Sequence, residues 1–319
     1  MRFARSVGTL VAIAVLLCAL AAAAAAAPRV GVRTAGAHGF EGGLVMLSGD
    51  RLRVRLAVRG APPGSRLVVR AVHNGRQVLM RRREVAGNRT VAERLRVQGP
   101  GVVGVRVRLT GPDGAPLVRK RPLRVGVVQP TAAPGARGLR VRLLQRRLAR
   151  MRYAIRVSGR FDDATRRAVI ALRKVNRMKR VGVASRAVFS LAIRGRGAFR
   201  PRHRGAAHVE GDLTRQVLAL VGRGGRVFKV YMTSSGRPGL RTPAGTHAFY
   251  RKSAGWNSSG MLDSAYFTRA AGGRPACAIH GYFVVPIWNA SHCCLRVPTA
   301  DARKIFNWVR IGQRIHVYY

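Results

Sequence analysis

Between residues 29 and 128, apolar and polar side chains alternate with the two-residue period of half-buried β-strands. This alternation, often of arginine with an apolar residue, recurs in residues 51–58, 67–72, 91–97, 102–109 and 123–128. Turn-forming Gly, Pro, Asn and Asp residues separate the runs at residues 61–64, 74–75, 99–101 and 111–114. Short strands at this spacing predict a small β-sandwich of immunoglobulin-like architecture over residues 29–128.

A linker of Pro, Ala and Gly over residues 130–138 marks the next change, because beyond it the apolar residues recur with helical spacing. Three short amphipathic runs follow, with expected buried faces at Val141, Leu144, Leu148 and Met151, at Ala168, Val169, Leu172 and Val175, and at Val188 and Leu191. Asp162 and Ser185 stand where they would cap the second and third helices. Residues 134–196 are therefore predicted to form a compact three-helix bundle.

A basic linker rich in Gly and Arg, residues 194–205, precedes a third region over residues 207–319. Its first part predicts a β-hairpin with a two-glycine turn at residues 224–225. Near its end, Thr299 is placed to cap a helix with Ala302, Ile305, Phe306 and Val309 on its buried side, and residues 314–319 follow as a final strand. The chain is thus predicted to be multidomain and mostly β, ending in a β-rich domain with one late helix.

The charge of the chain is strongly unbalanced, with 60 Lys plus Arg against 11 Asp plus Glu and a net charge of +49. Such an excess implies a polyanionic partner or polyanionic surroundings, such as nucleic acid, anionic lipid or an anionic polymer. The alternative is that the arginine content reflects coding bias and the charges form a solvated surface. A hydrophobic content of 47% is that of a globular protein rather than a disordered one.

The N-terminus narrows the choice of partner. Arg2 and Arg5 precede an apolar run over residues 7–20 and seven alanines over residues 21–27, which is the layout of a secretory signal peptide. The alternative is a retained membrane anchor, since the run is just long enough to span a bilayer. In either case we expect residues 1–27 to direct the chain out of the cytoplasm, which argues against nucleic acid as its partner.

The residues that could take part in catalysis are concentrated in residues 278–296. A His280-Gly281 pair comes first, and Cys294 follows 14 positions after the histidine within the hexapeptide Ser-His-Cys-Cys-Leu-Arg that ends at Arg296. A cysteine and a histidine brought together are the minimum for a thiol nucleophile and its base. Because an ordinary cysteine has a pKa near ~8.5, we expect the imidazole, Arg296 and the positive field to favour the thiolate.

The order His-Gly, then Ser-His-x-Cys-x-Arg, closely resembles the signature of the L,D-transpeptidase (YkuD-like) catalytic domain. These bacterial enzymes cross-link peptidoglycan through an acyl-cysteine. The resemblance covers residues 207–319, including a Thr-Pro-Ala-Gly-Thr loop at residues 242–246, and departs from the family where Cys293 stands in place of the usual glycine. Residues 144–182 are similar to the peptidoglycan-binding module often fused to wall enzymes, except that Leu172-Arg173 replaces its usual Phe-Gln pair.

The resemblance implies a role for each site residue. Cys294 is the nucleophile, and His280 is the base, oriented by the backbone carbonyl of Gly281. The backbone N–H groups of Cys293 and Cys294 form the oxyanion hole.

Other residues near this pair have candidate roles. Ser291 and His292 supply supporting hydrogen bonds, with His292 as the alternative base. Arg296 can bind a substrate carboxylate through its planar fork. Trp256 and Tyr266 are candidates to line the peptide groove, with burial in the core as the alternative.

We therefore expect an exported L,D-transpeptidase that forms 3→3 cross-links in peptidoglycan. The alternatives are an L,D-carboxypeptidase with the same acyl-enzyme, and an inactive wall-binding protein in which Cys293 has closed a hole that glycine kept open. The expected partners are peptidoglycan stem peptides and anionic cell-wall polymers, with no nucleic acid. For the β-sandwich, a spacer, a wall-facing module and a purely structural domain stay open.

No cofactor or metal is expected. The alternative is a zinc site built from His280, His292, Cys293, Cys294 and perhaps Cys277. It is disfavoured because adjacent cysteines cannot easily supply two ligands of one tetrahedron.

The cysteine count raises a separate possibility. With the signal peptide removed, Cys277, Cys293 and Cys294 remain, and if Cys294 stays free the other two are the available intramolecular pair. Side-chain alternation allows the bond if His280 and Cys294 face each other. Distance argues against it, because three strand residues span ~10 Å and a disulfide needs Cα atoms within ~7 Å. Both outcomes stay open.

Overall fold

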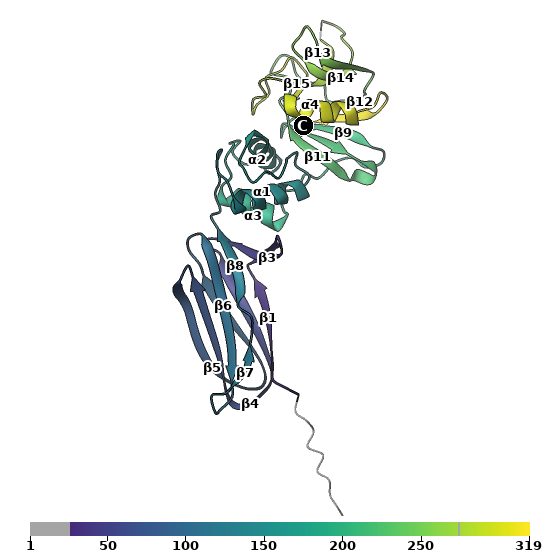
Figure 1. The fold of residues 1–319 in the computed structure, drawn as a ribbon. Helices are drawn as coiled ribbons and strands as arrows, with labels where there is room; N and C mark the ends of the chain where they lie inside the picture. Colours follow the sequence, from purple (N-terminus) through teal and green to yellow (C-terminus); the bar gives the residue numbers. More distant parts are fainter. Residues whose placement is uncertain (1–25, 274) are drawn as a thin grey trace, which may run out of the picture.

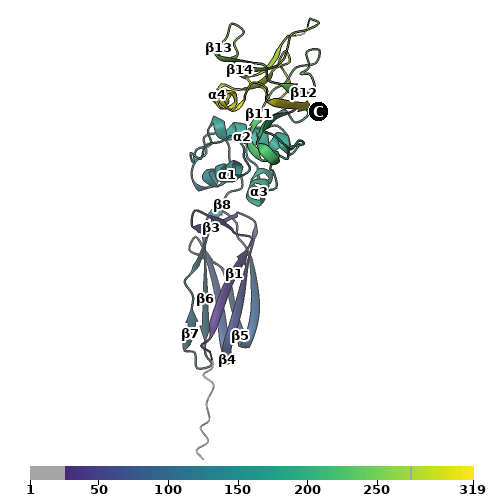
Figure 2. The same ribbon diagram turned by 90° about the vertical axis from the view of Figure 1, so that its right-hand side faces the viewer.

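The computed structural model describes residues 26–319 apart from residue 274. The predicted signal peptide therefore lies, except for its last two residues, outside the described part of the chain. Within that part, no helix combines the length and the apolar character needed to cross a membrane. Three units follow one another along the molecule: a β-unit, a group of three helices, and a C-terminal β-rich domain (Figures 1 and 2).

The N-terminal unit contains eight strands. They are β1 (Arg29–Ala35), β2 (His38–Phe40), β3 (Gly43–Leu47), β4 (Arg51–His73), β5 (Arg76–Arg96), β6 (Gly101–Thr110), β7 (Pro116–Arg119) and β8 (Leu123–Val128). All belong to one hydrogen-bonded sheet with the order β1-β4-β6-β8-β3-β2, in which β5 pairs with β4 and β7 pairs with β6. The immunoglobulin-like arrangement stays a prediction.

One predicted turn in this unit is wrong. Residues 61–64 lie inside β4, where the pairing with β5 shifts register on both sides of Ala61. Gly60 and Gly64 adopt positive φ angles of 62° and 75°, so the strand bulges and continues instead of reversing. As a result the first half of β4 pairs with β1 and the second half with β6. The predicted turns at 74–75, 99–101 and 111–114 lie between strands.

The arginine–apolar alternation explains why this unit folds despite its charge. In β4, Leu52, Val54, Leu56 and Val58 are fully buried, while the arginines between them are exposed. Burial of apolar surface at about 25 cal/mol per Å² therefore drives the sheet to close on a core of Val, Leu and Ala. The guanidinium groups stay in solvent on the outer face.

The helical unit consists of α1 (Leu139–Arg150), α2 (Asp163–Val175) and α3 (Arg186–Arg194). Asp162 caps α2 as predicted, because its carboxylate accepts a hydrogen bond from the Thr165 N–H at 2.8 Å. Ser185 stands at the N-cap of α3, but its side chain makes no capping hydrogen bond there. The predicted apolar faces of α1 and α2 lie in the core that joins the helices.

This core continues into the C-terminal domain. Strand β10 (Val217–Val221) is buried at all five positions, because alternate side chains pack on the helices and on the interior of the domain. Val217, Ala219 and Val221 face the helices, and Leu218 and Leu220 face inward. The helical unit and the C-terminal domain thus share one apolar core.

The C-terminal domain has two sheets. The five-stranded sheet, in the order β11-β10-β9-β17-β12, contains β9 (His208–Asp212), β10, β11 (Val227–Met232), β12 (Gly245–Ala248) and β17 (Arg314–Tyr318). A short 3-10 turn, η1 (Arg223–Gly225), joins β10 to β11. The four-stranded sheet, in the order β13-β14-β15-β16, contains β13 (Arg251–Trp256), β14 (Leu262–Thr268), β15 (Cys277–Tyr282) and β16 (Leu295–Pro298).

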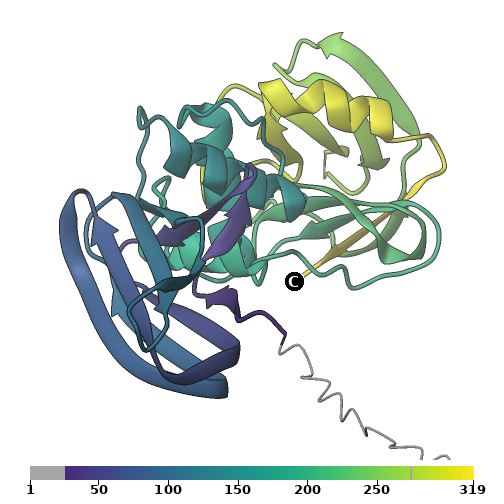
Figure 3. The same ribbon diagram turned by 60° about the horizontal axis from the view of Figure 1, so that its bottom comes forward.

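The late helix α4 (Thr299–Trp308) lies across the four-stranded sheet and packs on β14 and β15 (Figure 3). Ala302, Ile305 and Val309 are buried as predicted. The capping role predicted for Thr299 is wrong: Thr299 is already the first helical residue, and Pro298 occupies the N-cap. Proline has no side-chain acceptor, so no side-chain hydrogen bond caps the N-terminus of this helix.

Candidate active site

The pairing of two strands determines which site residues lie next to each other. Strands β15 and β16 pair in parallel, with Ile279 beside Leu295 and His280 beside Arg296. This offset of 16 residues continues before β16, where the Ala278 N–H donates a 3.4 Å hydrogen bond to Sγ of Cys294. Because side chains alternate along a strand, His280 and Ala278 point to the same face of β15. Cys294 packs on that face, against Ala278.

Cys294 is the unpaired cysteine of the described chain, and its side chain is buried among apolar and aromatic neighbours. It packs against Tyr266 and Ala278, with Tyr250 and Met261 beside them. Burial raises the pKa of the Cys294 thiol, an effect that the Ala278 N–H and the charge of Arg296 reduce but do not cancel. The charge of Arg296 favours the thiolate as expected, but desolvation has the larger effect and favours the thiol.

His280 is also buried and neutral. Its Nδ1 lies 2.9 Å from the carbonyl oxygen of Gly281. A carbonyl can only accept, so Nδ1 carries the proton and Nε2 is left as the basic nitrogen. Burial lowers the pKa of His280 to about 4, with the Gly281 carbonyl opposing this shift and Arg296 adding to it. The pair is a neutral thiol and a neutral imidazole.

Gly281 has a packing role as well. A Cβ atom at this position would lie 2.7 Å from Cβ of Ala302 and 3.2 Å from Cβ of Leu262. Helix α4 therefore approaches β15 so closely that no other residue fits at 281 without a shift. This contact fixes the carbonyl that orients His280.

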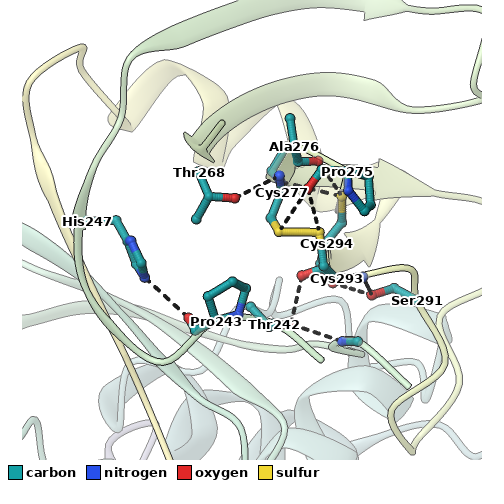
Figure 4. Close-up of a disulfide and its surroundings, with 12 residues drawn as sticks. Thr242, Pro243, His247, Thr268, Pro275, Ala276, Cys277, Ser291, Cys293 and Cys294 are labelled. Atoms are coloured by element: carbon teal, nitrogen blue, oxygen red, sulfur yellow. Dashed lines mark hydrogen bonds between the residues drawn. A yellow bond between two sulfur atoms is a disulfide. The ribbon is translucent and has the colours of Figure 1, made fainter. Parts of the chain in front are cut away.

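Cys277 and Cys293 form a disulfide, with Cα atoms 5.5 Å apart (Figure 4). The distance argument from the sequence assumed that His280 and Cys294 lie directly opposite each other. The parallel offset of 16 residues instead places position 293 beside 277, so the bond needs no long reach. The zinc alternative is wrong, because two of its candidate thiol ligands, Cys277 and Cys293, form this disulfide and cannot bind zinc.

Cys293 has a backbone conformation that suits glycine. Its φ angle is 118°, within the region that residues with a Cβ rarely adopt. The disulfide holds its side chain, and Oγ1 of Thr242 donates a 2.7 Å hydrogen bond to its carbonyl oxygen. A conformation of this kind costs about 1–3 kcal/mol, so these two contacts stabilise it against relaxation.

Ser291 closes the loop that carries the nucleophile. Its Oγ donates to the Cys294 carbonyl at 2.5 Å and accepts from the Cys293 N–H at 3.3 Å. Of the two backbone groups predicted to bind an oxyanion, the Cys293 N–H is thus directed to Ser291, while the Cys294 N–H has no hydrogen-bond partner among the described residues.

His292 lies away from the thiol. Its side chain is exposed, and the supporting hydrogen bond expected of it is absent from the described structure. It lines a pocket of about 380 Å³ that has the disulfide in its wall, with Leu240, Arg241, Pro243 and Arg269 among the other lining residues. Neither Cys294 nor His280 lines this pocket.

The three residues predicted to bind substrate have different environments. The Arg296 guanidinium stacks on the Tyr282 ring at 4.1 Å. Tyr266 is buried against Cys294, and Arg251 stacks on its outer face at 4.0 Å. Trp256 is 48% exposed and stacks on Phe283 at 4.5 Å. Tyr266 thus lies at the thiol, and Trp256 lies on the surface beyond it.

Sequence reasoning missed two cations of the helical unit that reach the C-terminal domain. Lys174 is 1% exposed, and its Nζ donates to the carbonyls of Thr233 at 2.8 Å and Gln216 at 3.2 Å. Arg180 donates to the carbonyl of Ile287, in the loop between β15 and the nucleophile, at 2.9 Å. Lys174 was part of the recognised helical pattern, but that pattern carries no signal for a contact between units.

Comparisons with known proteins match two regions of the chain. The model of the L,D-transpeptidase catalytic domain family matches residues 206–317, and that of a putative peptidoglycan-binding domain matches residues 137–191. None of the curated proteins matches this chain.

Solved structures add a relative with a similar fold. The L,D-transpeptidase of Xylanimonas cellulosilytica is 31% identical, with a TM-score of 0.54, and the match covers 60% of this chain and 98% of that one. The L,D-transpeptidase of Stackebrandtia nassauensis is 19% identical, with a TM-score of 0.37, over 59% of this chain and 95% of that one. Because the first relative is 31% identical over 98% of its solved chain, which is residues 123–326 of that protein, and the family model covers the domain that holds Cys294 and His280, the chain belongs to the L,D-transpeptidase (YkuD-like) family.

Proposed function

We propose that this protein is an exported L,D-transpeptidase that joins two peptidoglycan stem peptides through an acyl-enzyme on Cys294. The observation that carries the proposal is the placement of an unpaired thiol and a neutral imidazole on one face of the β15–β16 pair, with Nδ1 of His280 held by the Gly281 carbonyl. That tautomer leaves Nε2 free to accept a proton, as a general base must.

In the first step, Sγ of Cys294 attacks the carbonyl carbon that precedes the terminal D-Ala of a tetrapeptide stem. The thiol proton passes to Nε2 of His280, and the carbonyl oxygen becomes an oxyanion. Because both groups start neutral, charge separates only as the new bond forms. Nearby Arg296 then stabilises the negative charge more than it stabilises the starting thiol.

The backbone supplies the donor for the oxyanion. The Cys294 N–H is the candidate that is free of a described partner, and the Cys293 N–H can join it by leaving its long contact with Ser291. Loss of one such donor typically costs about 2.7–4 kcal/mol in the transition state. The hydrogen bonds of Thr242 and Ser291 to this loop therefore support catalysis by holding the donors in place.

Collapse of the intermediate breaks the C–N bond, and His280 gives its proton to the departing amine of D-Ala. The amine of a second stem then loses a proton to His280 and attacks the thioester. This step forms the 3→3 amide and returns the thiol to Cys294. Tyr266, beside the thiol, and Trp256 with Phe283, farther out, are placed to contact the stem peptides, while Arg296 can hold a carboxylate.

Peptidoglycan is the partner that the two matched domains support. Export is part of the proposal and depends on residues 1–27, of which residues 1–25 lie outside the described structure. No cofactor takes part in the proposed steps.

Intact-mass measurement tests the proposal. The protein without its signal peptide is incubated with a tetrapeptide stem, alone and with a second stem as acceptor. A mass increase on Cys294 followed by a cross-linked product supports the transpeptidase. Release of D-Ala with no cross-linked product would instead show an L,D-carboxypeptidase, and no adduct and no product would show a wall-binding protein without activity.

A further inference from the structure

Two neighbouring hollows lie on the outer face of the N-terminal β-unit, with volumes of about 410 Å³ and 600 Å³. They share Arg70, Arg106 and Pro122 in their walls, so they form one continuous surface across β4, β5, β6, β7 and the segment into β8. Its cations are Arg70, Arg82, Arg106, Arg108, Arg119, Lys120 and Arg124. We call this surface the arginine groove.

The pairing of neighbouring strands places these cations close to one another. Arg70 on β4 lies directly opposite Arg106 on β6, and Arg108 lies directly opposite Arg119 on β7. Like charges in directly opposed positions destabilise a sheet. Residues 106 and 108 lie ~7 Å apart on the same face of β6, so the two pairs form a small grid of positive charge.

None of the seven cations has an ionic partner in the described structure. Each is absent from the salt bridges and from the side-chain hydrogen bonds formed by residues 26–319 without 274. Elsewhere in the same unit, arginine does find a carboxylate, as where Arg83 bonds to Glu93 at 2.9 Å. Glu84, the acidic residue of this face of β5, lies opposite Arg66 outside the groove.

A concave surface with a grid of unpaired guanidinium groups has the chemistry to bind phosphate. Arginine presents a planar fork of donors that matches phosphate oxygens. Two forks that converge from adjacent strands, as Arg70 and Arg106 can, suit a tetrahedral group with oxygens in several directions better than a planar carboxylate. The walls also contain apolar surface from Val68, Met80 and Pro122, against which the uncharged part of a repeat unit can lie.

We propose that the arginine groove binds a linear phosphodiester polymer of the cell wall and thereby holds the enzyme at its substrate. A polymer fits better than a single phosphate because the two hollows are continuous and because at least two separate cation pairs line them. The choice of a wall polymer over nucleic acid rests on the export given under the proposed function. The groove lies on β4–β8, apart from Cys294, so binding and acylation are separable.

The test measures binding of the protein without its signal peptide to poly(glycerol phosphate) at 50 and 200 mM salt. The Arg70→Gln/Arg106→Gln variant should bind at least ~10-fold more weakly at 50 mM salt. It should also show a shallower dependence of affinity on salt, because fewer counterions are released. A matched control is Arg53→Gln/Arg94→Gln, which removes another directly opposed, exposed pair between β4 and β5 outside the groove. The affinity of the control variant should fall less than ~3-fold. It loses the same charge as the groove variant but outside the groove, so only the general electrostatic attraction, which salt screens, is reduced.

Three outcomes would overturn the proposal: no binding by the wild-type protein, equal losses in the two variants, or binding of a carboxylate polymer as tight as that of the phosphodiester polymer. Thermal melting confirms that both variants fold. Acylation of Cys294 by a carbapenem, a reaction that the family resemblance implies, is measured in parallel and should be unchanged in both. Loss of acylation in the wild-type protein would contradict the proposed function instead, so the two failures can be told apart.

Discussion

Cys294 and Ala278 are joined by a 3.4 Å hydrogen bond from the Ala278 N–H to the thiol sulfur, which places the proposed nucleophile two residues out of register with His280 along β15. The same register puts Cys293 beside Cys277 on the reverse face. Two adjacent cysteines are thereby separated into one that is free and one that is bonded.

The first prediction separates the two cysteines by mutation. Cys294→Ser should abolish covalent labelling by a carbapenem, because it removes the nucleophile. Cys293→Gly should preserve or raise labelling, because glycine adopts a φ angle of 118° without strain. Intact mass and peptide mapping measure both effects. An adduct found on Cys293 would show that the assignment is wrong.

A second prediction measures the backbone strain at Cys293 apart from the disulfide. Both Cys277→Ala/Cys293→Ala and Cys277→Ala/Cys293→Gly lack the bond, and they differ only at the residue with φ 118°. The glycine variant should be more stable by about 1 kcal/mol or more, since a strained φ angle costs about 1–3 kcal/mol and the flexibility of glycine offsets part of this. Denaturant unfolding decides it, and equal stabilities would mean that position 293 is not strained.

The third prediction counts thiols. The oxidised, denatured protein without its signal peptide should show one reactive thiol, at Cys294, and three after reduction. Because the bond closes a separation of 16 residues, reduction should lower the free energy of unfolding by about 3 kcal/mol. Three thiols before reduction would rule out the bond.

The fourth prediction concerns pH. The pKa of His280 is lowered to about 4, so the imidazole stays neutral, and able to accept a proton, throughout the range from pH 7 down to about 4. The rate of acylation by a carbapenem should therefore show no loss centred near pH 6.5, the ordinary histidine value, and should fall only as the pH approaches 4. The unfolded chain binds this proton from pH 6.5 downward, so stability falls over the same range and folding must be monitored by circular dichroism.

Two histidine variants test which residue acts as the base in acylation. His280→Ala should abolish acylation, whereas His292→Ala should reduce it less than tenfold, because the His292 side chain is exposed and lines a pocket without Cys294. If His292→Ala removes acylation and His280→Ala does not, the base is His292.

The fifth prediction concerns Lys174, whose pKa burial lowers to about 7. Between pH 7 and about 10.5 the unfolded chain holds this proton and the native chain does not, so the contribution of Lys174 to stability becomes more favourable as the pH rises. At 1.36 kcal/mol per pH unit, the difference in stability between wild type and Lys174→Met should change by about 2–3 kcal/mol from pH 7.5 to 9.5. Denaturant unfolding of both proteins at both pH values measures it, and a constant difference would contradict the shift.

The sequence predicted the local elements well and the relations between them less well. The arginine–apolar alternation marked the strands of the N-terminal unit, but it could not show that β4 continues through residues 61–64, because Gly and Pro favour a bulge and a turn alike. The motif identified Cys294 and His280, yet the pairing of Cys277 with Cys293 depended on a parallel register that no local pattern encodes. The raised thiol pKa depended on burial, which has a larger effect on this pKa than the charge of Arg296.

The apolar core shared by α1–α3 and β10–β11 limits where the chain can be truncated without exposing buried apolar side chains. A fragment that begins at residue 207 would bare Val217, Ala219, Val230 and Met232 to solvent, and we expect it to aggregate. The same cluster includes Val45, Leu47 and Val128 of the N-terminal β-unit, so a fragment that begins near residue 134 would also lose part of this core. We therefore expect the three units to fold best when they are produced together as one chain.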